Sequence, residues 1–328
     1  MMKKIIYGLA IAAVTLTSCS DFLDKEPSNK LDADKFFANQ TELDLYANGL
    51  YVDFIPSAEE LTSSGSGTCD YLATSTTSPL LMADFNVDKM SGWTYGAWTN
   101  LFRCNYFLKN INKAASTTDA ATLDYYRGIA RFWRAYFYFD KVKTYGDLPW
   151  YDEPIDADDH DLLYKVRDSR EFVMNKILED INFACEHLKA SKDEKISRYA
   201  ALALKSRICL FEGTYRKYHS VNPSTNEAWQ EADGSRKYLQ ACIDASEELM
   251  NSGAYSLVNT GNPATDYRSL FQSEKPKDQE VIMAREYSAD LMSTHNVTQK
   301  FNSAGNDTRR WSPTQEFVNT YLNLDAGG

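Results

Sequence analysis

The residue whose surroundings most clearly define a chemistry is Cys19. It follows Leu16, Thr17 and Ser18, and a leucine, two small residues and a cysteine form the pattern at which lipoprotein signals are cleaved. The cysteine thiol takes a diacylglycerol, and the amine freed by cleavage usually takes a third acyl chain such as palmitate. Two or three acyl chains hold a protein stably on a membrane, whereas one chain holds it marginally. We therefore expect the mature chain to begin at a lipid-modified Cys19.

The segment before Cys19 has the composition of a secretory signal. Two lysines precede an apolar run from Ile5 to about Val14, and small residues follow. This run is too short for a permanent transmembrane helix, which needs roughly 20 apolar residues. An ordinary secretory signal with a chance cysteine is the alternative, but the cysteine lies where the apolar run ends. Residues 1–18 are assigned to the signal peptide, and we expect membrane attachment by the lipid anchor only.

Other chemically active residue types do not form a catalytic or metal-binding motif. The four histidines lie far apart, and the sequence contains no HExxH, CxxC or GxSxG. The acidic run 156–161 resembles calcium-ligand spacing but lacks the glycine and closing glutamate of an EF-hand, which favours a solvated loop. With 46 acidic residues, a carboxylate pair for glycoside hydrolysis can be chosen anywhere, so it has no specificity. We predict a protein that is not an enzyme and has no metal or cofactor.

Aromatic residues in loops are more informative. Trp93, Tyr95 and Trp98 lie where a long loop meets a predicted helix, and Trp311 follows two arginines in another loop. Flat rings beside polar groups suit stacking on the faces of sugars. The alternative is that these rings cap the helical core. These four residues are the candidate ligand contacts that the sequence offers.

Composition excludes one class of partner. The 328 residues include 46 acidic and 35 basic ones, a formal net charge of −11, without a basic stripe, so nucleic acid is not expected as a partner. The 21 tyrosines suggest that some face solvent or a ligand, although abundant tyrosine also suits a helical bundle. Of the six cysteines, those other than Cys19 are far apart, which favours buried free thiols over a disulfide framework.

Amphipathic helices position these loops. Apolar residues recur at helical spacing, for example at Leu43, Tyr46, Ala47 and Leu50. The predicted helices cover residues 40–54, 98–114, 120–145, 169–189, 197–218 and 236–252. Long insertions of loop composition separate them, at 56–92, 152–161 and 219–234. Beyond these helices we expect short β-like runs, such as 281–284, and a short helix that starts at residue 312.

The predicted helices come in pairs along the chain. Small residues such as Ala130, Ala203 and Ala245 lie among aromatics on the apolar faces, which is how paired helices pack closely in tetratricopeptide solenoids. The strict 34-residue period of such repeats is absent, because long insertions separate the partners. A plain helical bundle is the alternative on the pattern alone.

Six segments together resemble one family. They are Cys19–Pro27, Asn105–Ile111 (similar to an "NYFLENI" helix), Arg131–Pro149, Ala200–Leu210, Ser252–Leu257 and Pro313–Val318 (similar to "PTQELV"). The chain resembles the SusD/RagB family of Bacteroidota outer-membrane lipoproteins. The resemblance implies a mainly α fold, in which tetratricopeptide-like helix pairs form a right-handed superhelical scaffold with long inserted loops.

The resemblance also implies a function. Members sit on the cell surface over a SusC-like TonB-dependent transporter of the outer membrane, bind glycans, and pass them to that barrel without catalysis. In some glycan-binding relatives a tryptophan near the start of the helix before "NYFL" stacks on sugar. Trp98 is the closest position here, and Asn100 lies nearby. A peptide-binding RagB-like subunit, a surface glycoside hydrolase and a pure protein adapter are the alternatives.

The domain organisation follows from these assignments. After the signal peptide we expect a lipidated tether at 19–40, a SusD-like helical scaffold at 41–260, and the start of the C-terminal region of the family at 261–328. Members of the family continue well past the "PTQELV" segment, so we expect this C-terminal region to be incomplete.

Overall fold

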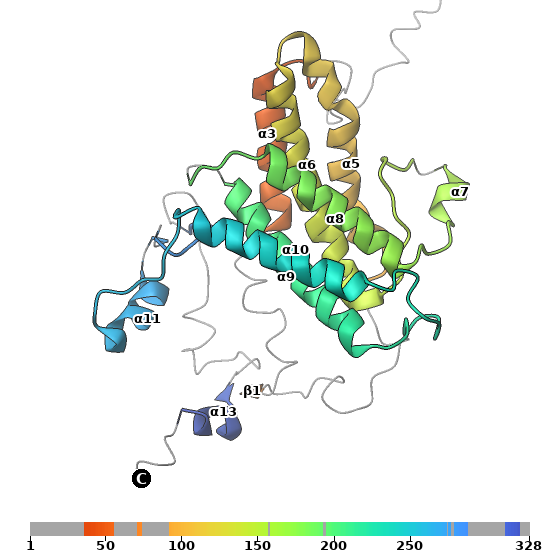
Figure 1. The fold of residues 1–328 in the computed structure, drawn as a ribbon. Coiled ribbons are helices and arrows are strands. Elements are labelled where there is room, and N and C mark those ends of the chain that lie inside the picture. Colours follow the sequence, from red (N-terminus) through yellow and green to blue (C-terminus); the bar gives the residue numbers. More distant parts are fainter. Residues whose placement is uncertain are drawn as a thin grey trace, which may run out of the picture.

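The computed structural model describes residues 36–55, 71–73, 92–287 without 157, 193, 194, 274, 277 and 278, and 312–321. It is mainly helical, as predicted (Figure 1). The α-helices are α3 (Gln40–Phe54), α5 (Thr99–Asn110), α6 (Ala120–Tyr145), α7 (His160–Leu163), α8 (Arg170–His187), α9 (Arg198–Tyr218), α10 (Gly234–Asn251), α11 (Pro263–Gln272) and α13 (Gln315–Asn319). The 3-10 helices are η3 (Tyr95–Trp98) and η4 (Ile111–Ser116), and the two strands are β1 (Leu72–Ala73) and β2 (Ser312–Pro313).

Polar residues set where the long helices begin. The side chains of Asn39, Asp119, Ser169 and Ser197 each accept a hydrogen bond from a backbone N–H in the first turn of α3, α6, α8 and α9. Such caps satisfy donors that have no partner within the helix. The predicted cap at Ser169 is therefore confirmed, and Gly146 ends α6 with a positive φ of 72°.

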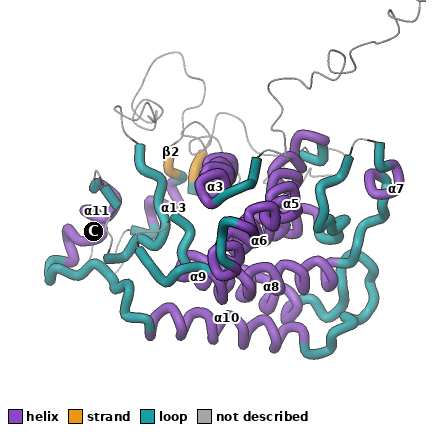
Figure 2. Tube along the Cα trace, turned by 90° about the horizontal axis from the view of Figure 1, so that it is seen from above, coloured by secondary structure: helices purple, strands orange, loops and turns teal. Residues whose placement is uncertain are grey.

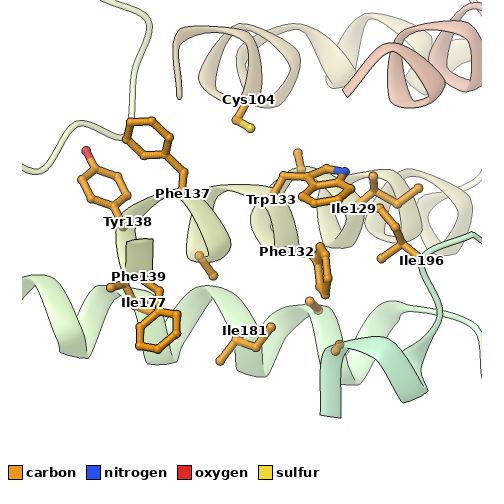
Figure 3. Close-up of a cluster of buried hydrophobic side chains, with 14 of the residues drawn as sticks. Cys104, Ile129, Phe132, Trp133, Phe137, Tyr138, Phe139, Ile177, Ile181 and Ile196 are labelled. Carbon is orange, nitrogen blue, oxygen red and sulfur yellow. The ribbon is translucent and has the colours of Figure 1, made fainter. Parts of the chain in front are cut away.

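Helix α6 is the centre of the core. It packs on α3 and α5 with one side and on α8 with the other. Helix α8 in turn packs on α9, and α9 packs on α10 (Figure 2). Trp133 stacks on Phe54 of α3, with ring centroids 4.8 Å apart. In Figure 3, Phe132 and Phe139 face Ile181 and Ile177 of α8 on the opposite side.

The predicted helix pairs are found in the structure. The pairs α6 with α8 and α9 with α10 make the most extensive contacts among the described elements, and α3 also packs on α5. The predicted helix 98–114 is instead shorter, because the 3-10 helices η3 and η4 flank α5 on both sides. Among the described residues, no helix is both long and apolar enough to cross a membrane.

The C-terminal part departs from prediction at one place. The run 281–284 is not a strand but irregular backbone held against the end of α3, since the Tyr51 hydroxyl donates to the Ala284 carbonyl and Arg285 to the Ile55 carbonyl. The predicted short helix is present as α13, and β2 before it pairs antiparallel with β1.

Candidate functional site: an aromatic and cationic cluster at the end of α6

Trp93 lies at the centre of a cluster of aromatic rings near the C-terminal end of α6. Its ring centroid is 4.9 Å from that of Tyr145 and 5.3 Å from that of Trp98, and both contacts are edge to face, at 84° and 77°. Such edge-to-face pairs are the favoured geometry for aromatic rings. Trp93 is 42% exposed, whereas Trp98 is half-buried.

Trp98 connects this cluster to the core. Its ring lies 5.6 Å from that of Phe137 and 6.0 Å from that of Tyr151, and both of those rings are buried. The two interpretations of the tryptophans therefore apply to different residues. Trp98 packs as a cap on the core, and Trp93 presents aromatic surface to solvent.

Two cations lie over the same rings. The guanidinium carbon of Arg167 is 4.6 Å from the centroid of Trp93. The ammonium of Lys141 is 5.5 Å from Phe137 and 5.9 Å from Tyr145. Cations at such distances from a ring face are attracted by the ring quadrupole. We refer to Trp93, Trp98, Tyr145, Arg167 and Lys141 as the aromatic–cationic cluster.

The backbone before Trp93 has a conformation that requires glycine. Gly92 has a φ of +103°, which L side chains rarely adopt. A Cβ atom at this position would also lie 2.9 Å from the Tyr145 hydroxyl oxygen. Glycine therefore lets the chain approach the end of α6 closely enough for Trp93 to contact Tyr145.

A buried polar network supports the loop that carries Tyr151. Arg134 of α6 donates two hydrogen bonds to Asp180 of α8, of 2.6 and 2.9 Å, and one of 3.0 Å to the Asn105 side chain. Asn105 in turn donates to the carbonyls of Tyr151 and Glu153. Burial alone would lower the pKa of Arg134, but the hydrogen bonds and charge of Asp180 raise it. One buried ion pair thus joins α5, α6 and α8 to the loop beneath the cluster.

Hydrogen bonds also fix the positions of Tyr151 and Lys165. The Tyr151 hydroxyl donates to the Leu162 carbonyl, and its N–H donates to the Tyr138 hydroxyl at 2.7 Å. Burial, with a smaller contribution from Asp168, raises the pKa of Tyr151. The side chain of Asp168 accepts from Lys165 and from the Trp150 N–H, which ties the segment before α8 to the loop that follows α6.

The other predicted site residues are only partly placed. Tyr95 begins η3, two residues after Trp93. Asn100 donates to the Asp53 carbonyl and ties α5 to α3, so its contact with a ligand stays a prediction. Cys19 and Trp311 lie outside the described residues. The acidic run 156–161 is partly described: it ends in α7, and its Asp159 caps that helix.

Sequence reasoning missed both cations of the cluster. Lys141 follows the aromatic run of α6 by helical spacing from Phe137 and Tyr145, so the period of the helix could have found it. Arg167 lies in a loop far from Trp93 in the sequence, and no local pattern places it there. Among the described residues, no group of three or more His, Cys, Asp or Glu side chains could hold a metal ion.

Comparison with known proteins identifies the scaffold. A family model named SusD-like and described as "starch-binding associating with outer membrane" matches residues 21–210, which is more than half of the chain. The chain belongs to the SusD-like family. The resemblance to SusD/RagB proteins is thereby confirmed, together with the mainly helical, tetratricopeptide-like fold.

Individual relatives of this SusD-like chain are distant. The SusD-like protein P25 of Formosa agariphila is 22% identical over 297 residues, which cover 84% of this chain and 50% of that protein. A SusD-like protein of Bacteroides fragilis matches in structure with a TM-score of 0.61 and 23% identity, over 88% of this chain and 54% of its own. A surface glycan-binding protein A of Bacteroides fluxus matches with a TM-score of 0.58 and 16% identity, over 87% of this chain and 62% of its own. The chain thus spans about half the length of the curated relative that it matches.

Proposed function

We propose that this SusD-like chain is a non-catalytic, glycan-binding lipoprotein of the cell surface, which passes an oligosaccharide to a SusC-like TonB-dependent transporter. The family description supports carbohydrate binding and association with the outer membrane. The cleavage pattern at Cys19 supports a lipid anchor. Because the match covers about half of the curated relative, activity and partners of the whole protein belong to this proposal.

One observation carries the assignment of a glycan as the ligand: the half-exposed ring of Trp93. Sugar rings bind by laying their C–H faces on flat aromatic surface while their hydroxyls pair with nearby polar groups. Trp93 is held by its contacts to Trp98 and Tyr145, so little side-chain freedom remains to be lost on binding. The cluster therefore favours glycan binding over a pure protein adapter.

The experiment is a binding measurement on the full chain in a non-glycosidic detergent. Starch-derived maltooligosaccharides and a wider panel of oligosaccharides are titrated by calorimetry. Trp93→Ala should weaken the binding of a positive oligosaccharide at least about tenfold, because a central aromatic contact is worth about 2 kcal/mol or more. Tyr218→Ala, at a 76% exposed ring on α9, is the matched control.

The outcomes separate the alternatives. Equal loss of binding in both variants, or unchanged binding in both, would remove the assignment of the site to Trp93. Absence of binding to every oligosaccharide, with binding to peptides, would favour a RagB-like peptide-binding subunit. Turnover of a bound glycan by the purified chain would show a hydrolase, and co-purification of a transporter without ligand affinity would show an adapter.

A further inference from the structure

The charge of the aromatic–cationic cluster defines the class of glycan further. Arg167 and Lys141 both lie over its rings, and within the described part of the chain no carboxylate lies within ion-pair distance of either. Such a pair of uncompensated cations is notable in a chain whose net charge is −11. An acidic ligand can supply a counter-charge to both.

The two acidic side chains next to these cations in the sequence already have partners of their own. Asp168, next to Arg167 in the sequence, accepts from Lys165 at 2.7 Å and from the Trp150 N–H. Asp140, next to Lys141, pairs with Lys143 at 3.1 Å. Among the described residues, the carboxylates next to Arg167 and Lys141 in the sequence therefore pair with other groups and not with these two cations.

The guanidinium of Arg167 can recognise an anion beside the Trp93 ring, from whose centroid its carbon lies 4.6 Å. A guanidinium is planar and holds its N–H donors in that plane. This planar fork matches the two oxygens of a carboxylate or sulfate, which it binds bidentately. Arg167 is exposed, so these donors can be reached from solvent. Because Arg167 and the Trp93 ring lie this close together, contact with the ring and charge pairing with Arg167 can act on one and the same sugar residue.

We propose that the cluster binds acidic oligosaccharides, in which the sugar ring contacts Trp93 and a carboxylate or sulfate pairs with Arg167, with Lys141 as a second cation. This inference rests on the proposed glycan-binding function and specifies the ligand class of that site. A neutral oligosaccharide satisfies the aromatic surface but leaves both cations unpaired. An acidic one satisfies both.

The test compares matched ligands on the full chain in a non-glycosidic detergent. A uronic-acid oligosaccharide is titrated beside the same oligosaccharide with each carboxyl reduced to the alcohol, and a sulfated oligosaccharide beside its desulfated form. We expect at least one acidic member to bind roughly ten- to a hundredfold more tightly than its neutral counterpart, the range for a hydrogen-bonded charge. Salt raised from 0.1 to 1 M shortens the screening length from about 10 to about 3 Å and should remove most of this preference.

Variants separate charge from ring contact. Arg167→Gln should abolish most of the acidic preference, and Lys141→Gln should reduce the preference in part. Trp93→Ala should weaken both members of a pair alike. Arg268→Gln, which removes an exposed arginine of α11 on the far side of the molecule from α7, is the control and should leave the preference intact (Figure 1).

Each contrary outcome has a distinct meaning. Equal affinity for the acidic and neutral members, or a preference that survives Arg167→Gln, overturns the inference and leaves the proposed glycan binding standing. An acidic peptide that competes as strongly as the acidic oligosaccharide also overturns it, because the cluster would then recognise charge alone. Absence of binding to every oligosaccharide would overturn the proposed function itself.

Discussion

Removal of the Asp180 carboxylate is expected to destabilise the scaffold severely. Asp180 and Arg134 are among the most buried charged residues described, with side chains 4% and 7% exposed. Asp180→Ala leaves the guanidinium buried with Asn105 as its remaining strong partner, at 3.0 Å. Breaking a buried ion pair from one side typically costs about 3–5 kcal/mol, since the other charge stays desolvated and unpaired. Domains have only about 5–15 kcal/mol of stability to lose.

Urea denaturation followed by circular dichroism measures this loss. With a dependence of about 3 kcal/mol per molar urea, the midpoint should fall by about 1 M or more. Glu179→Ala is the control, because Glu179 neighbours Asp180 but is 60% exposed and pairs with Lys176 on the surface. A surface pair of this kind contributes at most about 1 kcal/mol.

A double variant tests the reasoning itself. If the loss arises from an unpaired buried charge, then Arg134→Met with Asp180→Leu should recover part of it, because neither charge of this pair is then left buried without the other. Strict addition of the two single losses would refute this explanation. So would a loss in Asp180→Ala no larger than that in Glu179→Ala, because the pair would then contribute no more than an exposed one.

Three further predictions concern packing, thiol chemistry and the anchor. In the same assay, Gly213→Ala should destabilise the protein by about 1–3 kcal/mol, because its Cβ would lie 2.7 Å from Leu239 Cγ. Gly49→Ala is the control: its Cβ meets no atom within 4 Å, and it should stabilise α3 by about 0.5–1 kcal/mol. Burial raises the pKa of Cys185 from 9.0 to about 12, so the thiol should resist alkylation at pH 9 in the native protein and react after unfolding. Between pH 9 and 12 the folded chain keeps a proton on this thiol that the unfolded chain releases. The free energy of unfolding should therefore fall as the pH rises from 9 to 12. Cys19→Ala should abolish incorporation of labelled palmitate in cells, and incorporation that persists would contradict the assigned anchor site.

The cysteines show how composition and structure complement each other. Cys104, Cys185 and Cys209 are free and buried, and Cys242 is free and half-buried, in agreement with the expectation drawn from their wide spacing. The wide spacing of the cysteines did not indicate a disulfide framework, but it could not predict which thiols are buried. Only packing around α6, α8 and α9 decides that.

Helices were predictable because their signal is local. The period of apolar residues in α6 and α8 and the cap at Ser169 follow from contacts between residues a few positions apart. The run 281–284 was not predictable in this way. Its apolar residues suggest a strand, but hydrogen bonds from Tyr51 and Arg285, between segments more than 200 residues apart, hold it as irregular backbone.

The candidate site shows the same division. Sequence by itself selected Trp93 and Trp98, because aromatic residues at a loop–helix junction are a local pattern, and it predicted a lipid anchor at Cys19 and the order of the helices. Tertiary structure decided which tryptophan faces solvent, through the contacts of Trp98 with Phe137. It also brought Arg167 over Trp93, because the packing of α8 on α6 returns a distant loop to the end of α6. The charge at a site depends on which residues are neighbours in space. A sequence pattern predicts that charge only when those residues are also close in sequence.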